Sequence, residues 1–258
     1  MTFDDLDRSM RVFETVNDHR ILPGISIVAR LDGRNFTRLT KETLACEAPF
    51  DQRFRDLMAD TVEHLMRHSG FAVTYGYTQS DEISLLLAPD DDTFGRKLRK
   101  IVSILAGEAS ATFSLAAGVV ACFDCRVSQL PTSDHVVDYF RWRSEDAHRN
   151  ALNAHCYWLL RGQGMDASRA TSALEGMSVA DKNELLFRNG TNFNTLPEWQ
   201  RRGLGFYWDR SEGTPDPHAR RSEDRVPGRR IVRDLALPMK DAYDAYVRSR
   251  IDSSRRDR

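Results

Sequence analysis

Between two apolar runs the chain carries the segment Tyr75-Gly76-Tyr77-Thr78-Gln79-Ser80-Asp81-Glu82-Ile83-Ser84. The flanking runs, residues 71–77 and 83–88, are rich in strand-forming side chains, and the short polar turn between them predicts a β-hairpin. The turn holds two adjacent carboxylates. An acidic residue in a turn is usually exposed to solvent and has no functional role. Because successive strand residues point to opposite faces, we expect only one of Asp81 and Glu82 to face a given site.

A second acid lies upstream of this hairpin. The segment Ser26-Ile27-Val28-Ala29-Arg30-Leu31-Asp32-Gly33 is typical of a strand that ends in Asp-Gly. By itself, Asp-Gly is most often a turn. A functional interpretation therefore depends on whether the fold brings Asp32 to Asp81.

The order of the predicted elements answers that question. They are a strand at 25–32, a polar loop that extends to Pro49, a helix at 51–70, strands at 71–77 and 83–88, a helix at 93–111 and a strand within 115–130. Asp51 is a suitable N-cap for the first helix, and Gly70 is suited to end it. The order β-α-β-β-α-β is typical of the ferredoxin-like fold, so the fold class is α+β.

The connections of this fold predict that the two acids converge. Right-handed crossovers place the first strand beside the third, in antiparallel orientation. The end of the first strand, with Asp32, then lies next to the start of the third strand, with Asp81. Two carboxylates at adjacent strand ends predict a two-metal site.

The rest of the chain is mostly helical. A helix and a turn are predicted at residues 1–24, further helices at 134–162, 166–174, 178–189 and 240–250, and a turn and a strand at 199–208. Ser178 and Asp181 have the spacing of a capping box at the start of the helix 178–189. Residues 210–230 form a charged segment with little apolar content. We therefore expect a palm-type catalytic domain with appended helices at 1–209 and a charged, partly mobile C-terminal segment at 210–258.

Composition limits the alternatives. A net charge of −1 provides no general basic field, so any nucleic acid must bind to local patches. The N-terminus does not resemble a signal peptide, and the most apolar stretch, 101–123, is interrupted by polar residues. We therefore expect a cytoplasmic protein without a membrane span. Cys122 and Cys125 would face opposite sides of a strand, which favours reduced thiols over a zinc site.

A ferredoxin-like sheet supports several functions, so the site has to distinguish them. An RNA-recognition sheet would carry stacking aromatics on its first and third strands. Those strands read Ile-Val-Ala-Arg-Leu and Ile-Ser-Leu-Leu-Leu, without an aromatic residue. A polymerase palm needs instead carboxylates at strand ends that hold two Mg²⁺ ions, and this chain has them.

Four segments resemble those of the tRNA-histidine guanylyltransferase family, and in particular its guanylyltransferase-like, 3′-to-5′ polymerase branch. They are Arg30-Leu31-Asp32-Gly33-Arg34-Asn35-Phe36, Tyr77-Thr78-Gln79-Ser80-Asp81-Glu82, Phe123-Asp124-Cys125-Arg126-Val127 and Asp181-Lys182-Asn183-Glu184-Leu185-Leu186-Phe187. The resemblance implies a polymerase palm with added helices. It also implies an enzyme that activates a tRNA 5′-phosphate with ATP or GTP and then adds a nucleotide there.

The resemblance assigns roles to individual residues. Asp32 and Asp81 would be the catalytic metal ligands for two Mg²⁺ ions, with the Gly33 carbonyl as a further ligand. Nucleotide contacts would come from Arg34, Asn35, Phe36, Ser80, Arg96, Lys97 and Lys100. Contacts to tRNA or its phosphates would come from Arg30, His148, Asn150, Lys182 and Asn183. Partners would be tRNA and nucleoside triphosphates, and the assembly a homo-oligomer, a tetramer by resemblance.

Several of these assignments have an ordinary alternative. Basic residues at a helix start oppose the helix dipole, which favours a bound anion at 96–100, but a solvated basic face is also common. His148 could be a satisfied helix histidine, and Lys182 an ordinary exposed lysine. Ala48 stands where the family commonly has a lysine, so one phosphate contact differs.

The sequence of the predicted helix around His148 indicates which tRNA substrate to expect. It reads His148-Arg149-Asn150-Ala151-Leu152-Asn153-Ala154, where the eukaryotic family has His-Ile-Asn-Asn-Leu-Tyr-Asn. Because amide and tyrosine side chains read unpaired bases, their partial loss predicts template-dependent tRNA 5′-end repair. The alternative is a dedicated tRNA-histidine guanylyltransferase that adds one guanylate. A nucleotide cyclase-like palm enzyme and a non-catalytic RNA-binding protein are more distant alternatives.

Overall fold

The computed structural model describes residues 1–209 and 230–256, with side chains up to residue 251. Most of the expected charged segment, 210–229, therefore lies outside the described residues. A six-stranded antiparallel sheet forms the centre, in the order β4-β1-β3-β2-β5-β6. The strands are β1 Ser26–Gly33, β2 Val73–Gln79, β3 Glu82–Leu87, β4 Phe123–Leu130, β5 Leu204–Asp209 and β6 Arg230–Asp234.

The predicted β-α-β-β-α-β order is confirmed by β1, α3 Gln52–His68, β2, β3, α4 Leu98–Ala117 and β4. Asp51 caps α3 as expected, since its side chain accepts the backbone N–H groups of Arg53 and Phe54. The Arg53 guanidinium lowers the pKa of Asp51, so this cap is an ionised carboxylate.

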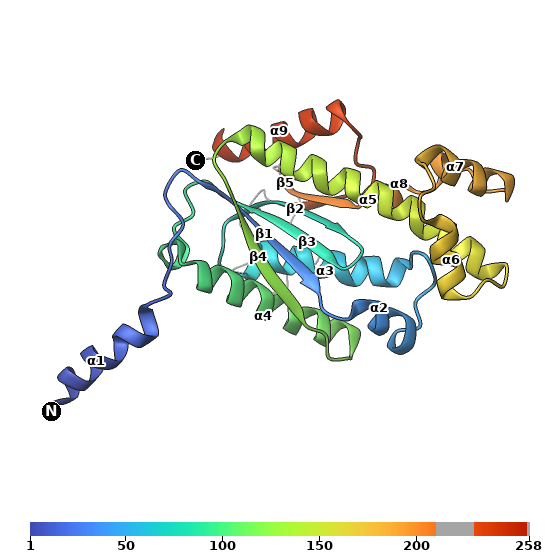
Figure 1. Ribbon diagram of the computed structural model, residues 1–258. Coiled ribbons are helices and arrows are strands. Elements are labelled where there is room, and N and C mark those ends of the chain that lie inside the picture. The colour runs from blue at the N-terminus through green and yellow to red at the C-terminus, as the bar shows by residue number, and fades with distance from the viewer. Residues whose placement is uncertain (210–229, 257–258) are drawn as a thin grey trace.

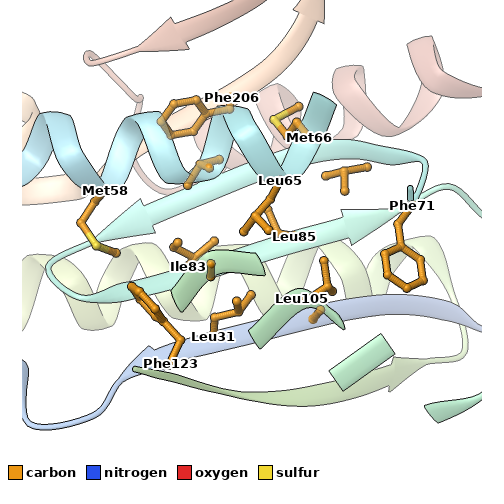
Figure 2. Packing of buried hydrophobic residues seen from close by; sticks show 14 of the residues in the cluster. Leu31, Met58, Leu65, Met66, Phe71, Ile83, Leu85, Leu105, Phe123 and Phe206 are labelled. Carbon is orange, nitrogen blue, oxygen red and sulfur yellow. The ribbon is translucent and has the colours of Figure 1, made fainter. Parts of the chain in front are cut away.

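Helices α3 and α4 cover one face of the sheet (Figure 1). Alternate residues of the strands point to this face and form the main core. Figure 2 shows Leu31 of β1 and Ile83 and Leu85 of β3 pointing toward the same packed interior as Met58 and Leu65 of α3. All five side chains are almost completely buried, which fixes the strand register at this end of the sheet.

The opposite face is covered by α5 Ser133–Gly162 and α9 Asp241–Arg256 (Figure 1). Here the core contains tyrosines whose hydroxyl groups find partners, as buried tyrosines usually do. The Tyr75 and Tyr243 hydroxyls are 3.2 Å apart, and those of Ser84 and Tyr139 are 3.1 Å apart. These contacts join α5 and α9 to the central strands.

A third cluster lies at the C-terminal half of α5, with α6 Ala167–Leu174 and α7 Val179–Arg188. Ser178 and Asp181 form the expected capping box of α7. The short helix α8 Glu198–Arg202 then leads into β5, where the sequence predicted a turn. Both β6 and α9 follow residue 209 yet pack with the sheet, while the division of the chain at that residue stays a prediction.

Two local predictions are wrong. The expected polar loop after β1 contains α2 Phe36–Arg38 and a π-helical turn, Leu39–Thr43. The second predicted helix starts at Leu98 rather than at residue 93, after a 3₁₀ turn, Thr93–Arg96. Phe94 and Gly95 have positive φ values of 53° and 60°, which an α-helix cannot accommodate.

The N-terminal helix α1, Phe3–Thr15, is present as predicted, but none of its residues is buried. It projects away from the sheet and its helices (Figure 1). Helix α4 is the one described helix that is long and apolar enough to cross a membrane. Its stripe of Ile101, Leu105, Ala109 and Phe113 is buried in the main core.

Candidate active site

The predicted convergence of Asp32 and Asp81 is confirmed. Strand β1 pairs with β3 in antiparallel orientation, and Asp32 lies opposite Glu82 in the register. One residue further, the Gly33 N–H donates to the Asp81 carbonyl oxygen at 3.1 Å. The end of β1 and the turn before β3 are therefore joined directly, although they are distant in sequence.

Strand parity does not separate Glu82 from Asp32, which corrects our expectation. Residues directly opposite each other in an antiparallel pair point to the same face, so Glu82 shares the face of Asp32. Asp81 lies in the turn before β3 begins, where the alternation of a strand does not apply. What distinguishes Glu82 from Asp81 is therefore its partners.

Two arginines form ion pairs with Glu82. Its carboxylate lies 3.6 Å from Arg30 Nη2 on one side and accepts a hydrogen bond from Arg143 of α5 on the other. Arg30 also lies 4.0 Å from Asp32 Oδ2. Arg30, predicted to contact tRNA or phosphate, is thus part of the charge balance within the acidic site.

Asp81 lacks such a partner within the described residues. Its side chain accepts a hydrogen bond from the Ser80 hydroxyl at 3.1 Å and forms no ion pair with a described residue. Burial raises the pKa of Asp81, and the nearby charges of Asp32 and Glu82 raise it further. A half-buried carboxylate beside another acid, with no cation of its own among the described residues, fits a divalent metal ion. Asp32, Asp81 and the Gly33 carbonyl would hold it.

A tightly packed backbone supports this site. A Cβ atom at position 33 would collide with the Phe36 ring, so the strand end requires glycine. Ser80 has a positive φ of 54°, which turns the hairpin sharply before Asp81. The positions of Asp32 and Asp81 therefore depend on both the backbone geometry and the packing of the core.

A cavity lies next to the hairpin turn, and sequence reasoning missed it. Its walls come from the segment after α2, the start of α3, the hairpin turn, α5 and α8. The aromatic side chains that line it are Phe50, Phe54, Trp158 and Trp199, and the hairpin contributes Thr78, Gln79 and Ser80. Lys41 lies over the Trp158 ring and Arg55 over the Trp199 ring. No spacing in the sequence links these segments, because only the fold brings them together.

The predicted nucleotide contacts divide into two groups. Arg34 and Asn35 are exposed just beyond Asp32, and Ser80 is exposed beside Asp81. Phe36 is only 2% exposed and packs against the rings of Phe113 and Phe123, which is a core position. The assignment of Phe36 as a nucleotide contact is therefore wrong for its side chain.

The structure does not bring Arg96, Lys97 and Lys100 to the acidic site. Arg96 donates to the carbonyl oxygens of Ile21 and Ile25, before β1, so it lies at the opposite end of that strand from Asp32. Arg96 is buried, Lys97 pairs with Asp18 at 2.6 Å, and Lys100 lies over the Phe94 ring. Because α4 starts beyond the far end of β3, these cations cannot reach a triphosphate bound at Asp32 and Asp81 of the same chain.

The remaining tRNA candidates lie along α5 and α7. Asn150 is exposed, while Lys182 donates to the Asn153 side chain at 2.9 Å and Asn183 donates to the Val179 carbonyl at 2.8 Å. His148 is half-buried against the Phe193 ring, and burial lowers the pKa of its imidazole. Its Nδ1 has no partner in the described part of the chain. The structure thus places Asn150 and Lys182 on the outside and His148 partly within.

Comparison with known proteins agrees with this arrangement. A family model described as tRNAHis guanylyltransferase matches residues 7–131, and a second, described as Thg1 C terminal domain, matches residues 134–241. A probable tRNA(His) guanylyltransferase of Drosophila melanogaster is 32% identical over 196 residues, 72% of this chain and 68% of the fly protein. The tRNA(His) guanylyltransferase of Neurospora crassa is 34% identical over 71% of this chain and 66% of its own length.

Solved structures give the same result. A bacterial tRNA(His) guanylyltransferase (Thg1)-like protein in complex with GTP has a TM-score of 0.74 and 26% identity, covering 96% of this chain and 99% of its own. The Saccharomyces cerevisiae tRNA(His) guanylyltransferase has a TM-score of 0.69 and 25% identity, covering 76% of this chain and 90% of its own.

A palm-type sheet with paired carboxylates at adjacent strand ends, in a chain with these relatives, defines a nucleotidyltransferase. The chain belongs to the tRNA(His) guanylyltransferase family. The two family-model matches together cover residues 7–131 and 134–241 of the chain.

Proposed function

We propose that this protein adds a nucleotide to the 5′ end of a tRNA, with guanylylation of tRNA(His) as the first candidate reaction. The observation that carries the proposal is the junction of Asp32 and Asp81 through the Gly33–Asp81 hydrogen bond. The names of the relatives favour tRNA(His) as the substrate and guanylate as the added group.

In this proposal Asp32, Asp81 and the Gly33 carbonyl hold Mg²⁺, with two ions as the expected number. When bound, the metal activates an attacking oxygen and stabilises charge on the leaving phosphate. Arg34 and Asn35 are exposed just beyond Asp32, and in this proposal they contact phosphate oxygens. The buried surroundings of Asp81 strengthen its attraction for a cation, because less water screens the charges.

The aromatic cavity beside Ser80 would receive the nucleotide base. Structures of bacterial relatives contain GTP or ATP, so both nucleotides are candidates for activation of the 5′-phosphate here. Trp158 and Trp199 offer apolar walls, and Ser80 connects the cavity to Asp81. A base in this cavity would therefore place its phosphates near the acidic end of β1.

The tRNA would approach along α5 and α7, where Asn150 and Lys182 lie. Contacts of this kind position a phosphate backbone without reading its sequence. A homo-oligomer, and a tetramer by resemblance, stays part of the proposal.

Template-dependent addition to 5′-truncated tRNAs is the second candidate, and α5 provides the observation that favours it. In the segment 150–154, Ala151 and Leu152 are buried, and the Asn153 side chain accepts a hydrogen bond from Lys182. Asn150 and Asn153 are both exposed, and each already has one side-chain hydrogen bond, to Asp146 and Lys182 respectively. The segment thus offers two partly occupied amides and no tyrosine to read an unpaired base. Base pairing within the acceptor stem would then select the added nucleotide.

A comparison of two substrates distinguishes the candidates. We expect kcat/KM for guanylate addition to full-length tRNA(His) to exceed that for templated addition to a 5′-truncated tRNA by about tenfold or more, about 1.4 kcal/mol in transition-state binding. Both tRNAs should carry the same 5′ phosphorylation, so that only length and identity differ. The reverse preference would establish repair, and failure to extend either tRNA would contradict the proposed function.

A further inference from the structure

We infer that Arg143 of α5 is a positioning residue, which holds the Glu82 carboxylate so that Asp32 and Asp81 alone face the metal. The inference rests on the proposed function and deepens it, because it assigns a task to a residue that contacts neither metal nor substrate. Arg143 belongs to none of the predicted site residues.

The contacts of Arg143 are specific. Its Nη2 donates to Glu82 Oε2 and lies 3.3 Å from Asp146 Oδ2 on the same helix. The Arg143 side chain is only 8% exposed, whereas Glu82 is 28% exposed. The buried guanidinium is held firmly between two carboxylates, because loss of either ion pair would leave its positive charge less well compensated in a site with little water.

Trp142 holds the guanidinium from a further direction. The Arg143 guanidinium carbon lies 4.8 Å from the centroid of the Trp142 ring, a distance at which cation–π attraction operates. Lysine lacks the planar fork that can serve both acids and stack on a ring, so it cannot reproduce this arrangement fully.

Glu82 needs such a restraint because of its place in the sheet. It lies directly opposite Asp32 in the register, on the same face. Without its arginine partner, the Glu82 carboxylate would be a third acid beside Asp32 and Asp81. It would then compete with these two carboxylates for the cation. Arg30, at 3.6 Å from Glu82 and 4.0 Å from Asp32, is shared between both acids and cannot fully neutralise Glu82.

The same contacts form a continuous chain from the surface of α5 to the acidic site. Asn150 donates to Asp146 Oδ2 at 3.3 Å, and Asp146 meets Arg143, which binds Glu82. Asn150 is one of the proposed tRNA contacts. Within this chain of contacts, Arg143 is the residue that links Asp146 to Glu82, so Arg143 is the residue to test.

The experiment compares Arg143→Met, Arg143→Lys, Glu82→Gln and the double variant Arg143→Met/Glu82→Gln. Mn²⁺ binding without substrate is measured from the electron paramagnetic resonance signal of free Mn²⁺, and nucleotide addition is measured against Mg²⁺ concentration. Arg141→Met is the matched control, because Arg141 lies on the same helix but pairs with Glu145 and Asp244.

We expect Arg143→Met to bind Mn²⁺ about fivefold more tightly, since Glu82 is released, while kcat falls by about tenfold or more at nearly unchanged KM. Adding Glu82→Gln should reverse the tighter binding and recover most of kcat, which a purely structural role would not allow. Arg143→Lys should give intermediate values, and Arg141→Met should behave like the unmodified protein.

Unchanged Mn²⁺ binding in Arg143→Met, or a double variant as impaired as Arg143→Met, would overturn the inference. If Arg143→Met does not fold, the same comparison between Arg143→Lys and Arg143→Lys/Glu82→Gln decides it. Absence of nucleotide addition in the unmodified protein would instead refute the proposed function, and the Mn²⁺ measurements would still decide the role of Arg143.

Discussion

Nucleotide addition by the Asp81→Asn variant is expected to fall by about three orders of magnitude or more. The substitution keeps the shape of the side chain and its contact with Ser80 but removes the negative charge that would bind the metal. Within the described residues no cation pairs with Asp81, so the change leaves no positive charge unpartnered. The folded state should therefore be as stable as before, or slightly more stable, because a half-buried and partly desolvated charge is lost.

Single-turnover incorporation of labelled nucleotide into tRNA measures the loss, and circular dichroism verifies the fold. Asp92→Asn is the matched control, since Asp92 is exposed, caps nothing with its side chain and lies beyond the far end of β3. Activity of a folded Asp81→Asn variant within about tenfold of the unmodified protein would remove Asp81 from the catalytic assignment.

Phe36→Ala is expected to lower the free energy of unfolding by about 3–5 kcal/mol, the range for a large aromatic side chain removed from a core. The Phe36 ring packs against Phe113 at 5.1 Å, Phe123 at 4.9 Å and Phe54 at 6.0 Å between ring centroids. It also lies against Gly33, so the cavity would open directly beneath the end of β1.

Urea unfolding of the two variants Phe36→Ala and Phe187→Ala measures this effect. Phe187 on α7 is 65% exposed, so its replacement should change the free energy of unfolding by no more than about 0.5 kcal/mol. A loss below about 1 kcal/mol for Phe36→Ala would contradict the core position and return Phe36 to the nucleotide contacts.

The convergence of Asp32 and Asp81 could be predicted because it depends on features that a sequence encodes locally. Strand periodicity, the hairpin turn and the handedness of the crossovers are enough to place the end of β1 beside the start of β3. The capping residues Asp51 and Ser178 likewise fixed the starts of two helices correctly. The strand, turn and cap signals involve residues within a few positions of one another, and the general rule for crossover handedness supplies the long-range step.

Other features depend on tertiary neighbours, which the sequence does not show. Phe36 follows the metal-site motif directly, and only the packing of α2 shows that its ring turns inward. The basic residues at 96–100 looked like an anion site on a helix start, but positive φ values delay the helix and Arg96 is used by backbone carbonyls. β6 follows a charged segment and has too few residues to show a strand pattern.

The role of Glu82 illustrates the limit most clearly. Because β3 begins at Glu82, Asp81 lies in the turn, and the alternation of strand residues does not relate the two side chains. Arg143, which binds Glu82, comes from a helix far along the chain and has no spacing that would mark it. Contacts between distant segments decide which of two adjacent acids is available, and the sequence does not contain that information locally.

The location of a transferred label tests the central claim most directly. The protein is incubated with Mg²⁺, tRNA(His) lacking its additional guanylate, ATP, and GTP labelled at the α-phosphorus, and the tRNA is then digested to map the label. A site that transfers nucleotides to the 5′ end predicts a label at that end, dependent on Mg²⁺ and absent with the Asp32→Asn variant. A label at the 3′ end, or conversion of GTP to a cyclic nucleotide without labelled tRNA, would contradict the account.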